Sequence, residues 1–305
     1  MNLLEYENYQ EKKTHFDASF PYNTYLCCIP QDFLSVPLHW HEEMEIIYIK
    51  KGSGVVSIDL TSTVVAKGDI ILAAPGQLHG ISQYQDIRLE YENILFDLRM
   101  LEAKSSDSCT QDFFAPLRHS HRMQQNIYTP QDEKYTSIAS CLDQADDICR
   151  TFPSAYQLCI KSCLFRLFYE LFSDWSIASA AKKPLQDLEK LKLILKYVEN
   201  HYQERITIEQ IAAFCDYSQS HFMKYFKNAM GMTFIEYLND YRLTMAARLL
   251  LASDSNVLSI SQEVGFENLS YFNRSFKKKF STTPSAYRCA AIIKSENQKI
   301  KKSKP

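Results

Sequence analysis

Four side chains in the first third of the chain have the types and spacing of a metal-ligand or polar binding site. His39, His41 and Glu45 have odd numbers within one extended segment, so they share one face of a strand, and His79 follows a turn at Pro75-Gly76. Three imidazoles and one carboxylate suit a divalent Fe, Mn, Ni or Zn ion. The same groups could instead contact a bound small molecule directly, or be hydrogen-bonded structural residues near the mouth of a barrel.

The last third of the chain contains one short pattern twice, about 50 residues apart. In each copy an apolar pair four apart is followed by an aromatic, a polar stretch, and two aromatics four apart. The copies consist of Ile211, Cys215, Tyr217, Phe222 and Phe226, and, one residue longer in the middle, of Ile260, Val264, Phe266, Phe272 and Phe276. This pattern indicates a helix-turn-helix, whose second helix packs through its Phe pair and leaves its opposite face free to read DNA.

Side chains around the start of each second helix are the candidates for DNA contact. If the Phe pairs face the core, the neighbouring polar and basic residues project from the other faces. In the first copy the candidates are Ser218, Gln219, Ser220, His221, Met223, Lys224 and Lys227. In the second copy they are Asn268, Ser270, Tyr271, Asn273, Arg274, Lys277 and Lys278.

The chemistry of these side chains predicts their roles. An Arg side chain can donate two hydrogen bonds to guanine, and an Asn side chain can pair with adenine. Arg274 and Asn273 are therefore the strongest candidates for base reading. His221, Met223 and Tyr271 are equally compatible with being solvated helix residues. Lysines further along the helices are expected to contact phosphate, which adds affinity without sequence information: Lys227, Lys277, Lys278 and Lys279.

A long helix is predicted between the two copies. It runs from Thr233 to about Ala252, and its roughly 19 residues would span about 28 Å. That length is close to the repeat of about 34 Å between successive major-groove faces on one side of DNA. A single chain could therefore read two adjacent groove segments, with some DNA bending if the connection is stiff. Thr207, with Gln210 three residues later, predicts a capping box at the start of the first copy.

The segment from about 24 to 98 reads as short strands. Met44–Ile49, Gly54–Ile58 and Asp69–Ala73 are β-branched or apolar runs, punctuated by glycines at 52, 54, 68 and 76. Short strands with regular turn signals predict a β-sandwich or a small barrel.

From about Asp132 the pattern becomes helical. Two helices on either side of Pro153 are expected to form a hairpin that covers the barrel, forms a dimer interface, or both. Their apolar faces contain Ile138, Leu142, Ala145 and Ile148 in the first helix, and Ile160, Leu164, Leu167, Phe168, Leu171 and Trp175 in the second. The small and polar segment from Ser176 to Pro184 is the best linker candidate.

Length and composition limit the class of protein. With 305 residues and 46% hydrophobic content, the chain should form two domains. It has no apolar run of roughly 18 residues that could span a membrane, and Met1–Gln10 lacks the layout of a signal peptide. Nine scattered cysteines without a repeated CxxC predict reduced thiols in a cytoplasm.

The net charge of −2 conceals an asymmetry. From Leu185 to Pro305 there are 18 Lys and Arg against 12 Asp and Glu, whereas the remaining 184 residues have 16 against 24. The basic C-terminal part is therefore the one expected to meet a polyanion.

Residues 188–288 resemble the DNA-binding domain of the AraC family of transcriptional regulators. The resemblance covers about 100 residues, and its combination of motifs is very specific. It is carried by Ile211–Ser218, Phe222–Lys227, Arg242-Leu243, Ala246, Leu249-Leu250, Ile260, Val264–Phe266, Tyr271-Phe272, Arg274, Phe276–Lys278 and Thr283–Arg288. Two positions depart from the family pattern, with Ser281 where Gly is usual and Phe234 where Pro is usual. A serine in place of a left-handed glycine cap should cost about 1 kcal/mol.

The four-residue set in the N-terminal part resembles the cupin signature, HxHxxxE with a later glycine, Gly52, and a distal His. The spacing from Pro75 to His79 is one residue short of the usual enzyme motif, and the usual distal Asn is absent. Sensor domains of AraC-like regulators commonly keep this framework without being enzymes. In that family the pocket frequently binds a sugar or another small metabolite.

The sequence thus predicts an α+β two-domain chain, with an N-terminal cupin-like β-barrel carrying a helical hairpin and a C-terminal all-α double helix-turn-helix. The expected boundaries are 1–130 for the effector-binding domain, 131–176 for a hairpin that dimerises, 177–187 for a linker, 188–290 for the DNA-binding domain and 291–305 for a basic tail.

The expected function is a sequence-specific DNA-binding transcriptional regulator, an activator or a repressor, controlled by a small-molecule effector such as a sugar or another metabolite. Its expected partners are double-stranded DNA, the effector, a second copy of the chain and, further, RNA polymerase. A cytoplasmic location is expected, with no membrane association, no enzymatic activity and no cofactor beyond the divalent metal considered above. The alternative is a metal-binding cupin enzyme or metal sensor fused to a DNA-binding domain.

Overall fold

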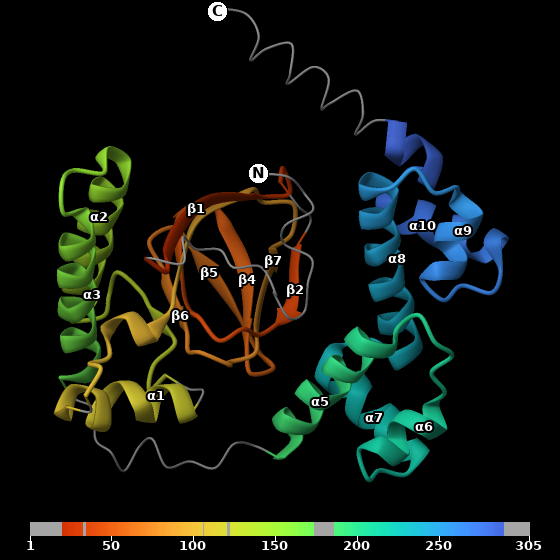
Figure 1. Cartoon of the computed structure of the whole chain (residues 1–305), viewed down its shortest axis with the longest axis horizontal. Coiled ribbons are helices and arrows are strands. Elements are labelled where there is room, and N and C mark those ends of the chain that lie inside the picture. Colours follow the sequence, from red (N-terminus) through yellow and green to blue (C-terminus); the bar gives the residue numbers. More distant parts are fainter. Residues whose placement is uncertain (1–19, 33–34, 106, 121–122, 174–185, 290–305) are drawn as a thin grey trace, which may run out of the picture. The chain divides into compact units, whose positions relative to one another are not determined.

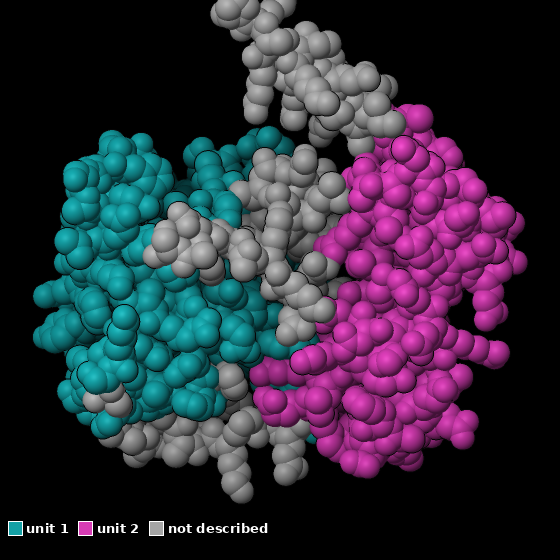
Figure 2. Space-filling view, viewed as in Figure 1, with its two compact units in different colours: residues 1–188 teal, residues 189–305 magenta. Residues whose placement is uncertain are grey.

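The computed structural model describes residues 20–32, 35–105, 107–120, 123–173 and 186–289. The chain divides into two compact units, Met1–Leu188 and Glu189–Pro305, which Figure 2 shows in different colours. Of the predicted linker, residues 177–185 lie outside the described part, and the remaining two belong to helix α5 (Gln186–His201). The predicted basic tail and Trp175 also lie outside the described residues.

Two antiparallel sheets form the β-sandwich of the first unit (Figure 1). The five-stranded sheet has the order β1 (Tyr22–Ile29), β8 (Leu89–Phe96), β3 (Met44–Lys51), β6 (Ile70–Ala73) and β9 (Ile127–Tyr128). The four-stranded sheet has the order β2 (Ser35–His39), β7 (His79–Gln83), β4 (Ser53–Ile58) and β5 (Thr61–Ala66). The three strands expected from the apolar runs correspond to β3, β4 and β6.

Both faces of the five-stranded sheet are buried, and the residues of β3 show how. Because side chains alternate along a strand, Ile47 and Ile49 point into the sandwich, where they join Val56 of the opposite sheet in one core. Ile46 and Tyr48 point outward and belong to a second core with the helices. This double burial explains why β3 reads as a continuous apolar run instead of an alternating one.

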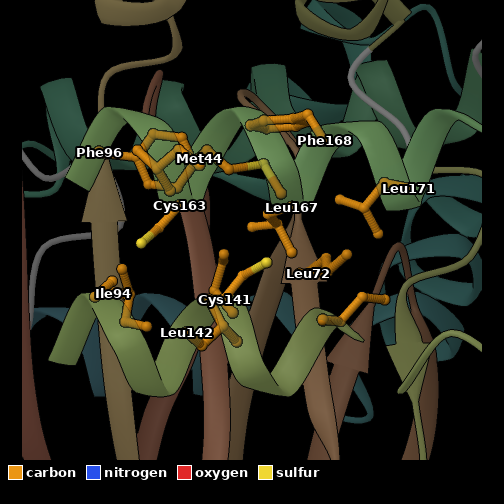
Figure 3. Packing of buried hydrophobic residues seen from close by; sticks show 14 of the residues in the cluster. Met44, Leu72, Ile94, Phe96, Cys141, Leu142, Cys163, Leu167, Phe168 and Leu171 are labelled. Carbon is orange, nitrogen blue, oxygen red and sulfur yellow. The ribbon is translucent and has the colours of Figure 1, made fainter. Parts of the chain in front are cut away.

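Helices α2 (Tyr135–Thr151) and α3 (Tyr156–Phe172) cover the outer face of the five-stranded sheet. Figure 3 shows Leu142 of α2 and Leu167 of α3 packed with Ile94 and Phe96 of the sheet. The predicted hairpin therefore shares a core with the barrel.

The segment between β8 and β9 was not resolved into elements by its sequence pattern. It contains a 3-10 helix (Leu98–Leu101), a π-helix (Thr110–Phe114) and α1 (Ala115–Ser120). Phe114 and Leu117 complete the core beneath α3.

The second unit is helical throughout its described elements. After α5 follow α6 (Ile208–Phe214), α7 (Gln219–Met230), α8 (Phe234–Ala252), α9 (Val257–Glu263) and α10 (Leu269–Phe280). The capping box predicted at Thr207 is confirmed, because its hydroxyl accepts from Gln210 N at 3.2 Å while Gln210 Oε1 accepts from Thr207 N at 2.9 Å. In Figure 1, α6 and α7 lie at the start of α8, and α9 and α10 lie beside its end.

All nine cysteines are free thiols. Within the described parts of the chain, no helix is both long and apolar enough to cross a lipid bilayer.

The two helix-turn-helix copies end their second helices differently, and this difference gives a stability prediction. Gly231 ends α7 in the left-handed conformation (φ 70°), and Ser281 adopts the same conformation (φ 57°) after α10. Since a side chain is strained there, we expect Ser281→Gly to raise the free energy of unfolding of the second unit by about 0.5–1 kcal/mol, measured by urea denaturation.

Gly231→Ser is the matched control for that substitution. A Cβ added at Gly231 meets no atom within 4 Å, so any loss there reports backbone strain alone. It should destabilise the unit by a similar amount. A neutral or destabilising Ser281→Gly would contradict the explanation.

Candidate DNA-reading helices and a buried histidine cluster

Helices α7 and α10, which we call the reading helices, present the same pattern of buried and exposed residues at an offset of 50 positions. In α7 the buried residues are Phe222 and Phe226, and in α10 they are Phe272 and Phe276, all fully inaccessible to solvent. The aromatic pairs pack within each copy at centroid distances of 5.8 and 5.7 Å. The Phe positions inferred from sequence therefore fix which face of each helix points away from the core.

All fourteen side chains predicted to contact DNA are exposed. Two of them have a second task, because Ser218 and Asn268 are the N-caps of the reading helices. Ser218 Oγ accepts from His221 N at 3.3 Å, and Asn268 Oδ1 accepts from Tyr271 N at 2.9 Å. Their side-chain oxygens stabilise the helix start.

Lys279 does not have the phosphate-contacting role suggested by its sequence neighbours. Its Nζ donates to Asp240 Oδ2 at 2.7 Å, to the Asp240 carbonyl at 3.0 Å and to Thr244 Oγ1 at 2.5 Å. Lys279 therefore anchors α10 to α8. Tyr271 is also partly engaged, because its hydroxyl accepts from Asn239 Nδ2 at 3.3 Å while the side chain stays 44% exposed.

A buried arginine connects the two helix-turn-helix copies. Arg242 of α8 donates through Nε to the Tyr202 carbonyl and through Nη2 to the Glu204 carbonyl, each at 2.7 Å. Gly265, in the turn of the second copy, lies close to the Tyr202 carbonyl and to Arg242 Nε. A Cβ there would lie 2.8 Å from the carbonyls of Tyr202 and Gln203 and 2.9 Å from Arg242 Nε. The loop after α5, the middle of α8 and the second turn are thus held together.

The four polar residues predicted in the first unit do meet, and we call them the histidine cluster. His39 ends β2 and lies opposite His79, the first residue of β7, in the β2–β7 pairing. Glu45 comes from β3 in the other sheet, and His41 from the connection between β2 and β3. The cluster therefore bridges the two sheets at one end of the sandwich. All four side chains are buried.

Glu45 is the centre of the histidine cluster. Its Oε2 lies 2.7 Å from His41 Nε2 and 3.0 Å from His79 Nε2. The ring of His39 packs on that of His79 with a centroid distance of 4.3 Å.

Burial and neighbouring charges act in opposite directions on this cluster. Burial lowers the pKa of His39 to about 3, so this ring is neutral at physiological pH. Burial would also lower the pKa of His41, but hydrogen bonds and charge from Glu43 and Glu45 outweigh it and raise that pKa to about 10. Although burial disfavours ionisation of Glu45, His79 and His41 hold its pKa well below the usual value.

Gln77 holds His79 in position through hydrogen bonds. No pattern in the sequence indicated this role. Its carbonyl accepts from His79 Nδ1 at 2.8 Å. Its side-chain Oε1 accepts from Ala74 N at 3.1 Å and from Asn126 Nδ2 at 2.9 Å, and its Nε2 donates to Asp59 Oδ2 at 2.8 Å. These bonds fix the Gln77 segment, whose carbonyl holds the histidine ring in one orientation.

The donor set of the histidine cluster fits a transition-metal ion. One ligand atom from each of the four residues lies within 4.8 Å of the others. Three imidazole nitrogens and one carboxylate oxygen form a coordination set suited to Fe, Mn, Ni or Zn. The same atoms could hydrogen-bond a small polar molecule.

Two family models match the chain. An AraC-like ligand binding domain matches residues 23–149, and a helix-turn-helix domain matches residues 207–290. The first match covers the sandwich, the histidine cluster and most of α2. The second covers both reading helices.

Three curated relatives illustrate the similarity. The chain is 24% identical over 288 residues to YdeC of Bacillus subtilis, named as an HTH-type transcriptional regulator, covering 94% of this chain and 98% of that protein. It is 24% identical to the raffinose operon transcriptional regulatory protein RafR of Pediococcus pentosaceus, over 91% and 97% of the two chains. It is 40% identical to the probable transcription factor PqrA of Proteus vulgaris, over 31% of this chain and 80% of that one. The chain belongs to the AraC family of transcriptional regulators.

Proposed function

We propose that the chain is a sequence-specific regulator that reads double-stranded DNA with both reading helices and is controlled by a ligand in its first unit. The observation that carries the proposal is the matched pair of exposed, polar helix faces joined through α8. The 19 residues of α8 correspond to about 28 Å. Because Arg242 and Lys279 tie both copies to α8, the pair acts as one reader of two groove segments.

Within this reader we assign the larger share of base recognition to α10. Asn273 and Arg274 are exposed, just over one turn past the start of α10, and their side chains suit adenine and guanine. The corresponding positions of α7 are Met223 and Lys224, which offer an apolar contact and a point charge. The remaining exposed lysines, such as Lys278, supply phosphate contacts.

The ligand-responsive part is the β-sandwich. We propose that a small-molecule effector, a sugar or another metabolite, is recognised at the end of the sandwich that contains the histidine cluster. The name of RafR, a relative over nearly the whole chain, supports a sugar. The ligand acts by binding one arrangement of the protein more tightly than another. As a regulator in the cytoplasm, the protein acts on transcription by RNA polymerase through binding and not through catalysis.

A homodimer formed through α3 is part of this proposal. Leu158, Phe165 and Tyr169 lie at helical spacing on α3 and are 71%, 44% and 59% exposed, while the opposite side of the helix packs on the sheet. Arg166 and Glu170 flank this stripe and form an ion pair with each other at 2.7 Å. A two-fold-related second copy would cover the apolar stripe with its own counterpart.

Arg274→Ala tests the assignment of base reading. We expect it to lower affinity for a selected duplex by about 1–3 kcal/mol and to relax base preference at one position. Lys278→Ala should weaken binding to all sequences alike and flatten the salt dependence. Selection from a random duplex library, followed by fluorescence anisotropy at several salt concentrations, measures both effects. Identical effects of the two variants on specific and nonspecific DNA would contradict the division of roles.

Phe165→Glu tests the dimer. A charge in the centre of the apolar stripe should convert the dimer to a monomer, measured by light scattering coupled to size exclusion. Gln157→Glu, exposed on the same helix, is the control and should leave the dimer intact. A monomeric wild-type chain, or a dimeric Phe165→Glu variant, would exclude this interface.

Ligand control is tested by measuring operator affinity and transcription with and without candidate sugars. We expect one of them to change the affinity at least 5-fold, the size of a typical allosteric coupling of about 1 kcal/mol. Unchanged binding and unchanged transcription with every candidate would contradict control by a sugar and leave DNA recognition standing.

A further inference from the structure

Helix α5 forms a second connection between the two helix-turn-helix copies, in addition to α8. Near its start, Lys190 Nζ donates to the Cys215 carbonyl at 2.9 Å and lies 4.1 Å from the centre of the Tyr217 ring, both in the turn of the first copy. About two turns later, the ring of Tyr197 packs on that of Phe214, the last residue of α6, at a centroid distance of 4.8 Å. The first copy is therefore fastened to α5 at two points.

The segment that follows α5 is fastened to the second copy. The Tyr202 side chain packs against the apolar core formed by α8, α9 and α10. Arg242 of α8 donates to the Tyr202 and Glu204 carbonyls, each at 2.7 Å. Gly265, in the turn between α9 and α10, approaches the same segment so closely that an added Cβ would lie 2.8 Å from the Tyr202 and Gln203 carbonyls. We call this meeting of Arg242, Gly265 and residues 202–204 the junction.

Two connections restrict a motion that one connection permits. If α8 alone joined the copies, each copy could turn about the α8 axis, and its reading helix would then point in a different direction. The junction lies to one side of that axis, so turning one copy would break its buried hydrogen bonds and close-packed contacts. The junction therefore fixes the angle between α7 and α10 about α8.

This angle matters for DNA, because the groove turns along the duplex. One base pair rotates the groove by about 34–36° and advances it by about 3.4 Å. Two reading helices at a fixed angle can enter two groove segments only if the separation of those segments matches that angle.

We propose that Arg242 is a positioning residue for DNA recognition, which makes the chain select two DNA segments at one fixed separation. Arg242 acts through the backbone, since it is 9% exposed and its Nε and Nη2 both donate within the chain. The inference rests on the proposed function, reading by both helices, and adds the geometry of the duplex that is read.

The experiment uses the full chain and a duplex selected from a random library, in which one chain recognises two segments. Duplexes with one base pair inserted or deleted between the segments are compared with the selected duplex by fluorescence anisotropy. The measured quantity is the ratio of the affinities for the selected and the altered separation. A variant that is only less stable binds all of these duplexes more weakly and leaves this ratio unchanged.

Arg242→Lys keeps the positive charge but has one donor nitrogen, which cannot replace both Nε and Nη2 at the Tyr202 and Glu204 carbonyls. An altered separation should lower the affinity of the wild type about 10-fold and that of the variant about 3-fold, because the copies of the variant can turn to follow the displaced segment. Lys279→Met is the control, since Lys279 bonds α10 to Asp240 of α8 outside the junction. It should keep the wild-type ratio.

Gly265→Ala disturbs the junction from its other side and keeps the test decisive if thermal denaturation shows that Arg242→Lys does not fold. The added Cβ forces the turn away from residues 202–204 and should reduce the ratio in the same way. A wild-type ratio in a folded Arg242→Lys variant overturns the inference. If that variant does not fold, a wild-type ratio in Gly265→Ala overturns it.

The two levels of the hypothesis fail differently. A selected site with two segments whose separation affects the wild type and both junction variants alike overturns only the role of Arg242. A selected site with a single recognised segment overturns reading by both helices, and the role of Arg242 with it.

Discussion

Arg242 is a charged side chain in the core of the second unit, and its need for oxygen partners fixes the geometry of the DNA reader. Burying a guanidinium without partners is strongly unfavourable. The carbonyls that satisfy it come from the loop between α5 and α6, which leads into the first helix-turn-helix copy. Gly265 of the second copy has no side chain and can therefore approach the same carbonyls. One buried charge thus aligns two motifs that are otherwise separated by a 19-residue helix.

The same requirement governs the first unit, where the buried polar groups are imidazoles instead of a guanidinium. Backbone carbonyls satisfy the Nδ1 atoms, and the Nε2 atoms and Glu45 are left to satisfy one another. In the reader the partners are complete within the chain, so Arg242 is structural. In the histidine cluster the acidic neighbours Glu43 and Glu45 raise the pKa of His41, and the protonated ring donates to Glu45 Oε2.

Local pattern in the sequence was sufficient for β3, β4, β6, the hairpin helices and the cap at Thr207, because each depends on residues within one or two turns. The expectation that His39, His41 and Glu45 share one face of a single strand was wrong, because His39 ends β2, His41 lies in the connection and Glu45 belongs to β3 of the other sheet. The role of Lys279 could not be found this way, since its partner Asp240 lies 39 positions away. The support from Gln77 depends on tertiary contacts with Asp59 and Asn126, and the π-helix after β8 has no regular apolar period to reveal it.

The position of the histidine cluster explains how an event there can reach the helices that cover the sheet. Gln77 contacts His79 through its carbonyl and Asn126 through its amide, and Asn126 also donates to the Leu72 carbonyl at 2.6 Å. Asn126 directly precedes β9, which pairs with β6, and α2 begins seven residues after β9. Because these elements share one close-packed core, a change in the orientation of His79 is resisted by every contact along this path. In the function that we propose, a ligand that fixes that ring would act on the elements packed against α2 and α3, and α3 is the helix to which we assign the dimer.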